Sequence, residues 1–493
     1  MRQRQRAYLW SRYRSIVGYL GGLTFVIGAV NLLPLPVLLF FPEEWRYAPV
    51  FVAVAVVMMA GGGWVGRRYR PSASNKISMQ ESAIVVTATW LIAILSSALP
   101  LWAVGGLTFT QAVFESCSGW TTTGLSFVDV TTTPHIVLMY RSILQLLGGA
   151  GLVILALTAE SGPINYGLSV MEGRSDKLAP HVKRSARLVA LLYGGYTVGG
   201  VVALWLVGMG PFDALNHAFT AVSTGGFSTQ ATSIGHFDSA PIEAVIIVLM
   251  ILGNVNFLTA WILLQGKFRA IGQNGELRLF AFLVAVSAVL LLALVTLRGD
   301  LGTGQAIRVA VFEAVSAFTG TGYSTVGYTG WSDIGWLILI VLMIAGGGSG
   351  STAGGLKQFR VFIMLRAVQW EVRKAFLPKH AVNEPAIWQG EKFTPLTDER
   401  VRQVGLFISL YMFILLVGTL VMTGYGYGLR ESLFEFASTL GTVGLSVGVT
   451  TSDTPGVVVW MQTIAMFLGR LEFFAVIIGT MKLAQDGRLL VRG

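Results

Sequence analysis

The chain has 493 residues, of which 54% are apolar and 12% are charged, and its mean hydropathy is +0.67. A soluble domain needs far more polar surface, so this composition excludes an ordinary globular protein and indicates a membrane protein. The formal net charge of +10 does not indicate a nucleic-acid partner, because 29 of the 35 Lys and Arg residues fall in alternate loops between apolar stretches. This positive-inside pattern predicts that both termini lie in the cytoplasm.

Ten apolar stretches are long enough to cross a hydrocarbon core of about 30 Å. They are 14–41, 47–66, 82–104, 135–158, 186–208, 240–264, 277–297, 335–365, 403–423 and 457–481. The first is flanked by arginines and lacks a small-residue cleavage site, so we interpret it as an anchored helix and not as a removed signal peptide. The longest polar stretch, 366–402, predicts a cytoplasmic helix and loop.

Four further apolar segments are only about 10–14 residues long, which suits re-entrant helices better than full crossings. They are 109–119, 212–222, 308–318 and 430–440. Each leads into a polar phrase made of glycine, a bulky apolar residue and serine, and the four glycines lie 102, 96 and 122 residues apart. These glycines are Gly124, Gly226, Gly322 and Gly444. A period near 100 residues is too long for a solenoid and predicts fused membrane units.

Two further positions match when the four phrases are aligned on these glycines. Nine residues earlier stand Glu115, His217, Glu313 and Glu435. Six residues earlier stand Ser118, Thr220, Ser316 and Ser438. Helix-packing faces rich in Gly, Ser and Thr are the alternative, but such faces require neither short flanking segments nor a common register. We interpret the carboxylates within the short helices as groups that fix the adjacent loops.

The predicted fold is an all-α polytopic membrane protein in which four helix–pore-helix–filter-loop–helix repeats surround one central pore. Two extra N-terminal transmembrane helices precede the repeats. The expected domains are 1–80 for the N-terminal helices, then 81–180, 181–275, 276–375 and 376–493 for pore repeats one to four. The third repeat also contains an expected intramembrane gating loop.

The glycine-centred loops are candidates for an ion filter. Non-helical backbone survives within a bilayer only where protein buries it or where it lines an aqueous cavity. Glycine leaves backbone carbonyls uncovered, and rings of such carbonyls hold dehydrated alkali cations. The predicted filter residues are Thr122, Thr123, Gly124, Thr224, Gly225, Gly226, Gly320, Thr321, Gly322, Thr442, Val443 and Gly444. A short helix whose C-terminus points at each loop would add partial negative charge there.

A glycine-rich run at 346–355 interrupts an apolar span, and six of its ten residues are glycine. Each glycine costs up to about 1 kcal/mol in a helix, so the helix should break here and form a gate below the filter. The predicted gate residues in this run are Gly346, Gly347, Gly348, Ser349, Gly350, Ser351, Thr352, Gly354 and Gly355. The alternative is a packing kink or a close helix crossing.

Two cations complete the predicted gate, Lys357 at the cytoplasmic edge and Arg470 in the last span. An arginine at a helix centre costs about 2.5–3.5 kcal/mol on insertion, so Arg470 should face the protein interior or the pore and hinder cations. The alternatives are a structural pair between Arg470 and a buried carboxylate, and snorkelling of Lys357. Glu472 is near Arg470 in sequence but lies on a different helical face.

Enzyme chemistry is not indicated by the sequence. The single cysteine, Cys117, excludes an internal disulfide, and the five histidines show no metal-ligand spacing. The spans contain no cluster of nucleophile and acid–base groups, so we expect no enzyme, no organic cofactor and no metal beyond a transported ion. The strongest competing class is a secondary transporter, because broken helices near the midplane are typical of those proteins too.

The four phrases resemble the filters of the TrkH/KtrB/HKT cation transporters. They read Thr-Thr-Thr-Gly-Leu-Ser at 121–126, Ser-Thr-Gly-Gly-Phe-Ser at 223–228, Thr-Gly-Thr-Gly-Tyr-Ser at 319–324 and Thr-Val-Gly-Leu-Ser at 442–446. The run 346–357 is similar to the gating loop of that superfamily, and Gly469-Arg470-Leu471-Glu472 is similar to the motif in its last helix. The two extra N-terminal spans make the chain resemble TrkH more than KtrB.

This resemblance implies K⁺ uptake across the plasma (inner) membrane, with K⁺ as the transported ion bound at the filter. It also implies a homodimer in membrane lipid and a cytosolic nucleotide-binding ring, TrkA-like, that controls opening. In related transporters a serine in place of the first filter glycine goes with Na⁺ permeation, so four glycines favour K⁺. The remaining alternative is coupling of the flux to Na⁺ or H⁺.

Overall fold

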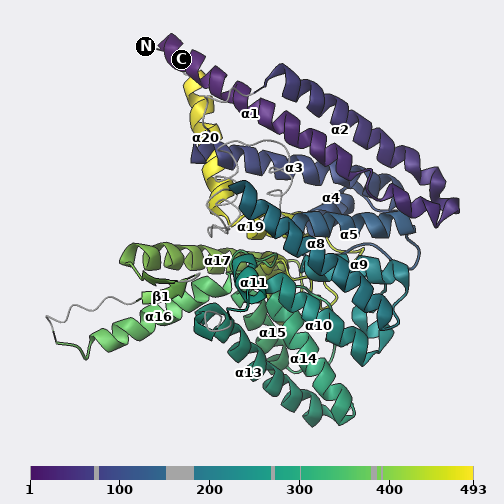
Figure 1. Ribbon diagram of the computed structural model, residues 1–493, viewed down its shortest axis with the longest axis vertical. Coiled ribbons are helices and arrows are strands. Elements are labelled where there is room, and N and C mark those ends of the chain that lie inside the picture. The colour runs from purple at the N-terminus through teal and green to yellow at the C-terminus, as the bar shows by residue number, and fades with distance from the viewer. Residues whose placement is uncertain are drawn as a thin grey trace.

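The protein is almost entirely helical in a computed structural model that describes residues 2–70, 77–150, 182–267, 272–299, 301–378, 386–389 and 392–491. Helices of very different length and direction pack around a central region that contains the irregular loops (Figure 1). The all-α class predicted from the sequence is confirmed. The start of α1 and the end of α20 lie together, because the Tyr13 hydroxyl donates to Asp486 at 2.9 Å.

The N-terminal hairpin consists of α1 (Arg2–Val30) and α2 (Ala48–Arg68), which run side by side along one flank (Figure 1). A Cβ atom on Gly21 would stand less than 3.0 Å from the backbone of Gly66, so glycine permits this close packing. The candidate membrane span of the structure is Ala7–Leu39, close to the predicted 14–41. Pro34 and Pro36 lack an N–H for an α-helical hydrogen bond, so α1 is followed by tighter turns after Val30.

Four units then repeat one order: a long helix, a short helix, an irregular loop and another helix. Their helices are α3 (Met79–Val104), α4 (Phe109–Trp120) and α5 (His135–Ala150); α8 (Val182–Leu206), α9 (Pro211–Val222) and α10 (Ala240–Asn254); α13 (Gly275–Arg298), α14 (Thr303–Thr319) and α15 (Asp333–Ala345); and α17 (Asp398–Gly424), α18 (Leu429–Gly441) and α19 (Gly456–Arg470). The four short segments of the sequence thus form the short helices α4, α9, α14 and α18. The domain boundaries stay a prediction.

Several predicted crossings are broken helices. The span 240–264 divides into α10 and α11 (Phe257–Leu264), and 335–365 divides into α15 and α16 (Gln358–Lys374). The last span, 457–481, divides into α19 and α20 (Phe474–Val491), which meet at an angle of 102°. Continuous crossings at the first and last of these stretches were therefore wrong predictions, whereas the break at 346–355 is confirmed.

The number of continuous crossings is correspondingly smaller than ten. Among the described residues, six helices are long and apolar enough to cross a membrane, or seven if α19 and α20 count as one span. Helices α10 and α15 have only 15 and 13 residues, which at 1.5 Å per residue fall short of a 30 Å core. The end of the predicted span 135–158, from residue 151, lies outside the described residues.

The polar stretch 366–402 contains a feature that the expected helix and loop did not include. After α16, strands β1 (Ala386–Gln389) and β2 (Lys392–Pro395) pair antiparallel, with Ala386 opposite Pro395. Ile387 is buried against Ile363 of α16 and Val404 of α17, so a small apolar cluster holds the hairpin on the helices. This short β-hairpin is the one sheet within the described residues.

Candidate functional site

Each glycine of the four aligned loops lies against the backbone of the next loop, and the contacts close a ring. A Cβ atom built on any of them would stand less than 3.0 Å from a neighbouring carbonyl oxygen. The glycine and carbonyl pairs are Gly124 with Gly225, Gly226 with Thr321, Gly322 with Val443, and Gly444 with Thr123. The order runs through loops one, two, three and four and returns to one. All four glycines also have positive φ, between 76° and 99°, which other residues adopt only with strain.

The turn that ends each short helix has one geometry in all four units. The residue two positions before the glycine is left-handed, with φ of 55°, 51°, 69° and 50° at Thr122, Thr224, Gly320 and Thr442. The N–H of the following residue donates to the carbonyl six positions before the glycine, at 2.8–3.1 Å. Three of these left-handed residues are β-branched threonines, a conformation that costs about 1–3 kcal/mol each. Strain at three equivalent positions marks the loops as a functional element.

The acidic residues of the short helices fix the loops, as the sequence predicted. Glu115 accepts from the Ser126 hydroxyl at 2.9 Å and from the Phe127 N–H at 3.0 Å. Glu435 accepts from Ser446 and from the Val447 N–H in the same way, at 2.9 and 3.1 Å. In unit three, Glu313 accepts from the Thr325 N–H at 2.8 Å.

Histidine replaces the carboxylate in unit two. The His217 Nε2 atom lies 2.9 Å from the Ser228 hydroxyl, the counterpart of the serine contact in units one and four. Because the ring nitrogen Nδ1 also lies 2.8 Å from the Asp213 carbonyl, His217 bridges its own helix and its loop. An imidazole thus replaces a carboxylate in positioning the loop of this unit.

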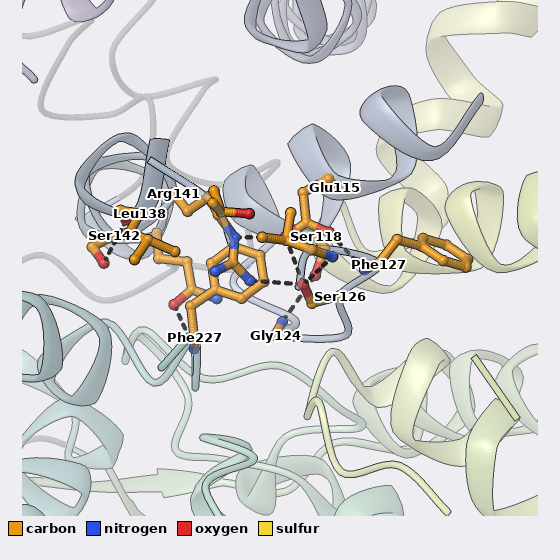
Figure 2. A network of polar contacts seen from close by, with 12 residues as sticks. Glu115, Ser118, Gly124, Ser126, Phe127, Leu138, Arg141, Ser142 and Phe227 are labelled. Atoms are coloured by element: carbon orange, nitrogen blue, oxygen red, sulfur yellow. Dashed lines mark hydrogen bonds and ion pairs between the residues drawn. The ribbon is translucent and has the colours of Figure 1, made fainter. Parts of the chain in front are cut away.

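Arg141 joins the first loop to the second (Figure 2). Its Nε donates to Glu115 at 2.7 Å, with both side chains almost fully buried, and its Nη2 donates to Ser126 at 2.8 Å. The guanidinium also lies over the Phe227 ring, 4.0 Å from its centroid. Our sequence reasoning missed this residue, although a charged side chain inside an apolar span was an available signal.

The threonine hydroxyls of the loops have two different roles. Those of Thr123 and Thr321 lie 2.8 Å from the hydroxyls of Thr121 and Thr319. Val443 stands at the same position of loop four and has no hydroxyl to make this contact. Among the described residues, the buried hydroxyls of Thr122 and Thr442 have no hydrogen-bond partner. These two oxygens are available to a bound ion.

The segment 346–357 packs directly against the ring. The Thr352 hydroxyl donates to the Gly253 carbonyl at 2.9 Å and lies 3.1 Å from the Thr224 hydroxyl of loop two. A Cβ on Gly354 would stand less than 3.0 Å from the Thr442 hydroxyl oxygen of loop four. The cavity beside these residues has a volume of about 10 Å³, room for about one water molecule.

Both predicted gate cations bind carbonyl groups of this segment. Arg470 donates to the Thr352 carbonyl at 2.5 Å and to the Gly148 carbonyl of α5 at 2.6 Å. Lys357 donates to the Ala353 carbonyl at 2.6 Å. Glu472, the nearby carboxylate, forms its ion pair with Arg360 of α16. Arg470 therefore connects the segment 346–357 to unit one.

Three further polar side chains, all missed from the sequence, hold the other end of the segment. Asn254 accepts from the Gly348 N–H at 2.9 Å, and Glu276 accepts from the Ser349 N–H at 2.5 Å. Asn256 donates to the Ser349 carbonyl. We call Asn254, Asn256 and Glu276 the latch. Two of them interrupt the predicted span 240–264, which was the available signal.

Comparison with known proteins agrees with this architecture. The sequence family described as TrkH, cation transport protein, matches residues 50–490. The Trk system potassium uptake protein TrkH of Halomonas elongata is 31% identical, over 94% of this chain and 98% of that protein. An uncharacterized cation transporter of Methanocaldococcus jannaschii is 29% identical over 94% of both chains. The crystal structure of the potassium transporter TrkH from Vibrio parahaemolyticus superimposes with a TM-score of 0.82 at 26% identity, covering 94% of this chain and 98% of that one. The family matches nearly the whole length of the chain, and the structure has the closed ring of four glycine loops. The chain therefore belongs to the TrkH family of cation transport proteins.

Proposed function

We propose that the protein takes up K⁺ across the plasma (inner) membrane through the ring of four loops, which acts as a selectivity filter. The observation that carries the proposal is the closed ring of glycine and carbonyl contacts. Carbonyl dipoles at such a ring replace the hydration shell of an alkali cation. The names of the Halomonas and Vibrio relatives, a potassium uptake protein and a potassium transporter, support K⁺ as the ion.

The gate of the proposed pathway is the segment 346–355 with Lys357 and Arg470. Thr352 and Gly354 lie against loops two and four, and the positive charge of Arg470 lies beside them. A cation leaving the filter would meet both a steric block and a like charge, which oppose its passage. Opening then requires that the segment leave the ring. Deletion of several of its glycines should increase K⁺ flux in liposomes, and unchanged flux would contradict the barrier role.

Regulation by a cytosolic nucleotide-binding ring, TrkA-like, is part of the proposal. Helix α16 follows the gate directly, and Val368 and Val372 on it are exposed, as is Phe393 of the β-hairpin. A partner that covers these apolar side chains could pull on α16 and thereby on the gate. We further propose a homodimer in the lipid bilayer. We also propose that both termini lie in the cytoplasm, and the proximity of α1 and α20 supports their lying on the same side of the membrane.

The test is reconstitution of the purified protein in liposomes, with K⁺ and Na⁺ uptake measured separately. We expect K⁺ uptake to exceed Na⁺ uptake, and we expect Gly124→Ser to reduce this preference by opening the ring to Na⁺. Addition of a nucleotide-binding partner should change the rate and leave the preference unchanged. Equal uptake of both ions in the unmodified protein would overturn the proposed selectivity.

The second candidate is a secondary transporter of K⁺ or another monovalent cation that is coupled to Na⁺ or H⁺. The breaks in α10–α11, α15–α16 and α19–α20 favour it, since discontinuous helices are typical of such carriers. Four equivalent loops around one ring favour a pore. A current that varies linearly with voltage without a counter-ion requirement indicates a pore, whereas a fixed stoichiometry with Na⁺ or H⁺ indicates a carrier.

A further inference from the structure

Gln145 of α5 reaches from unit one into the loop of unit two. Its amide nitrogen donates to the Gly225 carbonyl at 2.5 Å, and its amide oxygen accepts from the Phe227 N–H at 3.1 Å. The side chain is fully buried. One amide group therefore binds the backbone on both sides of Gly226, the glycine at the ring.

This contact explains why the second loop departs from the pattern of the others. Loops one, three and four have Thr, Thr and Val directly before the ring glycine, and loop two has Gly225. A Cβ atom on Gly225 would stand less than 3.0 Å from three side-chain atoms of Gln145. The amide of Gln145 thus fills the space that a side chain would need at position 225.

The hydrogen bond also changes the carbonyl that faces the ring. The Gly225 carbonyl is the group against which Gly124 packs, so it belongs to the ring itself. A carbonyl oxygen has two lone pairs, and a donor on one of them reduces the negative potential that a cation feels. A weaker field favours the larger cation, because the smaller one gains more from close approach to a strong dipole.

We propose that Gln145 is a positioning residue that determines specificity: it fixes the Gly225 carbonyl and weakens its field, and so favours K⁺ over Na⁺. This inference rests on the proposed function, since it assumes that the ring selects the ion. A side chain of unit one would thereby determine how strongly the Gly225 carbonyl of unit two attracts a cation.

The test compares the ratio of K⁺ to Na⁺ uptake in liposomes for three variants. Gln145→Met keeps most of the side-chain volume and removes both hydrogen bonds. We expect the ratio to fall about fivefold, the factor that corresponds to the free energy of one hydrogen bond. Asn31→Leu is the matched control. It also loses two buried hydrogen bonds, one of them to Tyr140 of α5, and its ratio should not change.

The third variant separates field from packing. Gln145→Ala combined with Gly225→Thr gives loop two the threonine of loops one and three and fills the space of the amide. We expect its ratio to fall as in Gln145→Met, because the donor is absent in both. It also provides the measurement if Gln145→Met does not fold. A ratio equal to that of the unmodified protein would show that Gln145 only fills space and would overturn the inference.

The same assay distinguishes this inference from the proposed function. If Gly124→Ser changes the ratio and neither Gln145 variant does, the ring selects the ion and the inference about Gln145 is wrong. If Gly124→Ser also leaves the ratio unchanged, the ring is not the filter and the proposed function fails. A lower maximal rate for both ions with an unchanged ratio would mean that Gln145 only stabilises the fold, which also contradicts the inference.

Discussion

The ring of four loops and the segment 346–357 are both glycine-rich, irregular and buried among apolar helices, yet they are held in different ways. Each ring loop is fixed by a group of its own short helix, such as Glu115 in unit one, and loop two is held by Gln145 of unit one as well. The segment 346–357 is held by Asn254 of unit two, Glu276 at the start of α13 and Arg470 of unit four. We infer from this difference how the proposed gating would work. Movement of α13, or of the ends of α10 and α19, would release the segment and leave the contacts within each ring unit intact.

The largest effect is expected from a change within the ring. Gly322→Ala places a Cβ atom against the Val443 carbonyl, and Gly322 has a φ of 77°. Backbone strain and overpacking together should lower the free energy of unfolding by about 2–6 kcal/mol. We expect K⁺ flux in liposomes to fall strongly and the remaining flux to be less selective for K⁺, as for Gly124→Ser. Gly304→Ala on α14 is the control, because no atom lies within 4 Å of its Cβ position. Normal flux through Gly322→Ala would contradict the close packing of the ring.

Substitutions of Arg141 and Arg470 should have opposite effects on ion flux. Arg141→Ala leaves the Glu115 carboxylate buried without its cation, and we expect about 3–5 kcal/mol of destabilisation with loss of flux.

Arg470→Ala removes hydrogen bonds to the Thr352 and Gly148 carbonyls, which would hold the proposed gate closed, and we expect flux to rise about tenfold. Thermal unfolding in detergent and flux in liposomes measure the two effects. Reduced flux with a well-folded Arg470→Ala protein would count against its role in the gate.

A smaller effect is expected from the latch. Asn254→Leu removes the acceptor for the Gly348 N–H, which is worth about 1 kcal/mol, so the closed state should lose about fivefold in population. Basal flux should rise by a similar factor with the ion preference unchanged. Thr296→Val is the control, because that hydroxyl donates to the Leu292 carbonyl of its own helix. A change of preference without a change of flux would place Asn254 in the ring instead.

The smallest effect is expected at the fourth loop. Val443→Thr gives loop four the residue of loops one and three, although Gly441 stands where those loops have the threonine that pairs with it. The ring contact at position 443 is made by the backbone carbonyl, which the substitution leaves in place. We expect the ratio of K⁺ to Na⁺ uptake to change by less than about twofold, which is smaller than the change that the loss of one hydrogen bond would cause. A larger change would show that side-chain hydroxyls at this position line the pathway.

Much of the architecture could be predicted from the sequence because it is local. The spans follow from apolar length, the short helices from segments too short to cross, and the ring glycines from a register that repeats within each unit. The carboxylates nine residues before the glycines belong to the same local frame, so their loop contacts could be predicted as well. The breaks after Asn254 and at Glu472 were missed, since their surroundings read as continuous apolar helix.

What the sequence by itself determined is thus the unit: its helices, its glycine and the groups that hold its own loop. Only the tertiary structure decided which partners meet between units, such as Gln145 with Gly225, 80 positions along the chain, and Arg470 with Gly148, 322 residues away. Such pairs follow no periodicity, because they depend on how four similar units are arranged around an axis. The physical reason is that buried polar groups must find partners, and the nearest partner in space belongs to another unit.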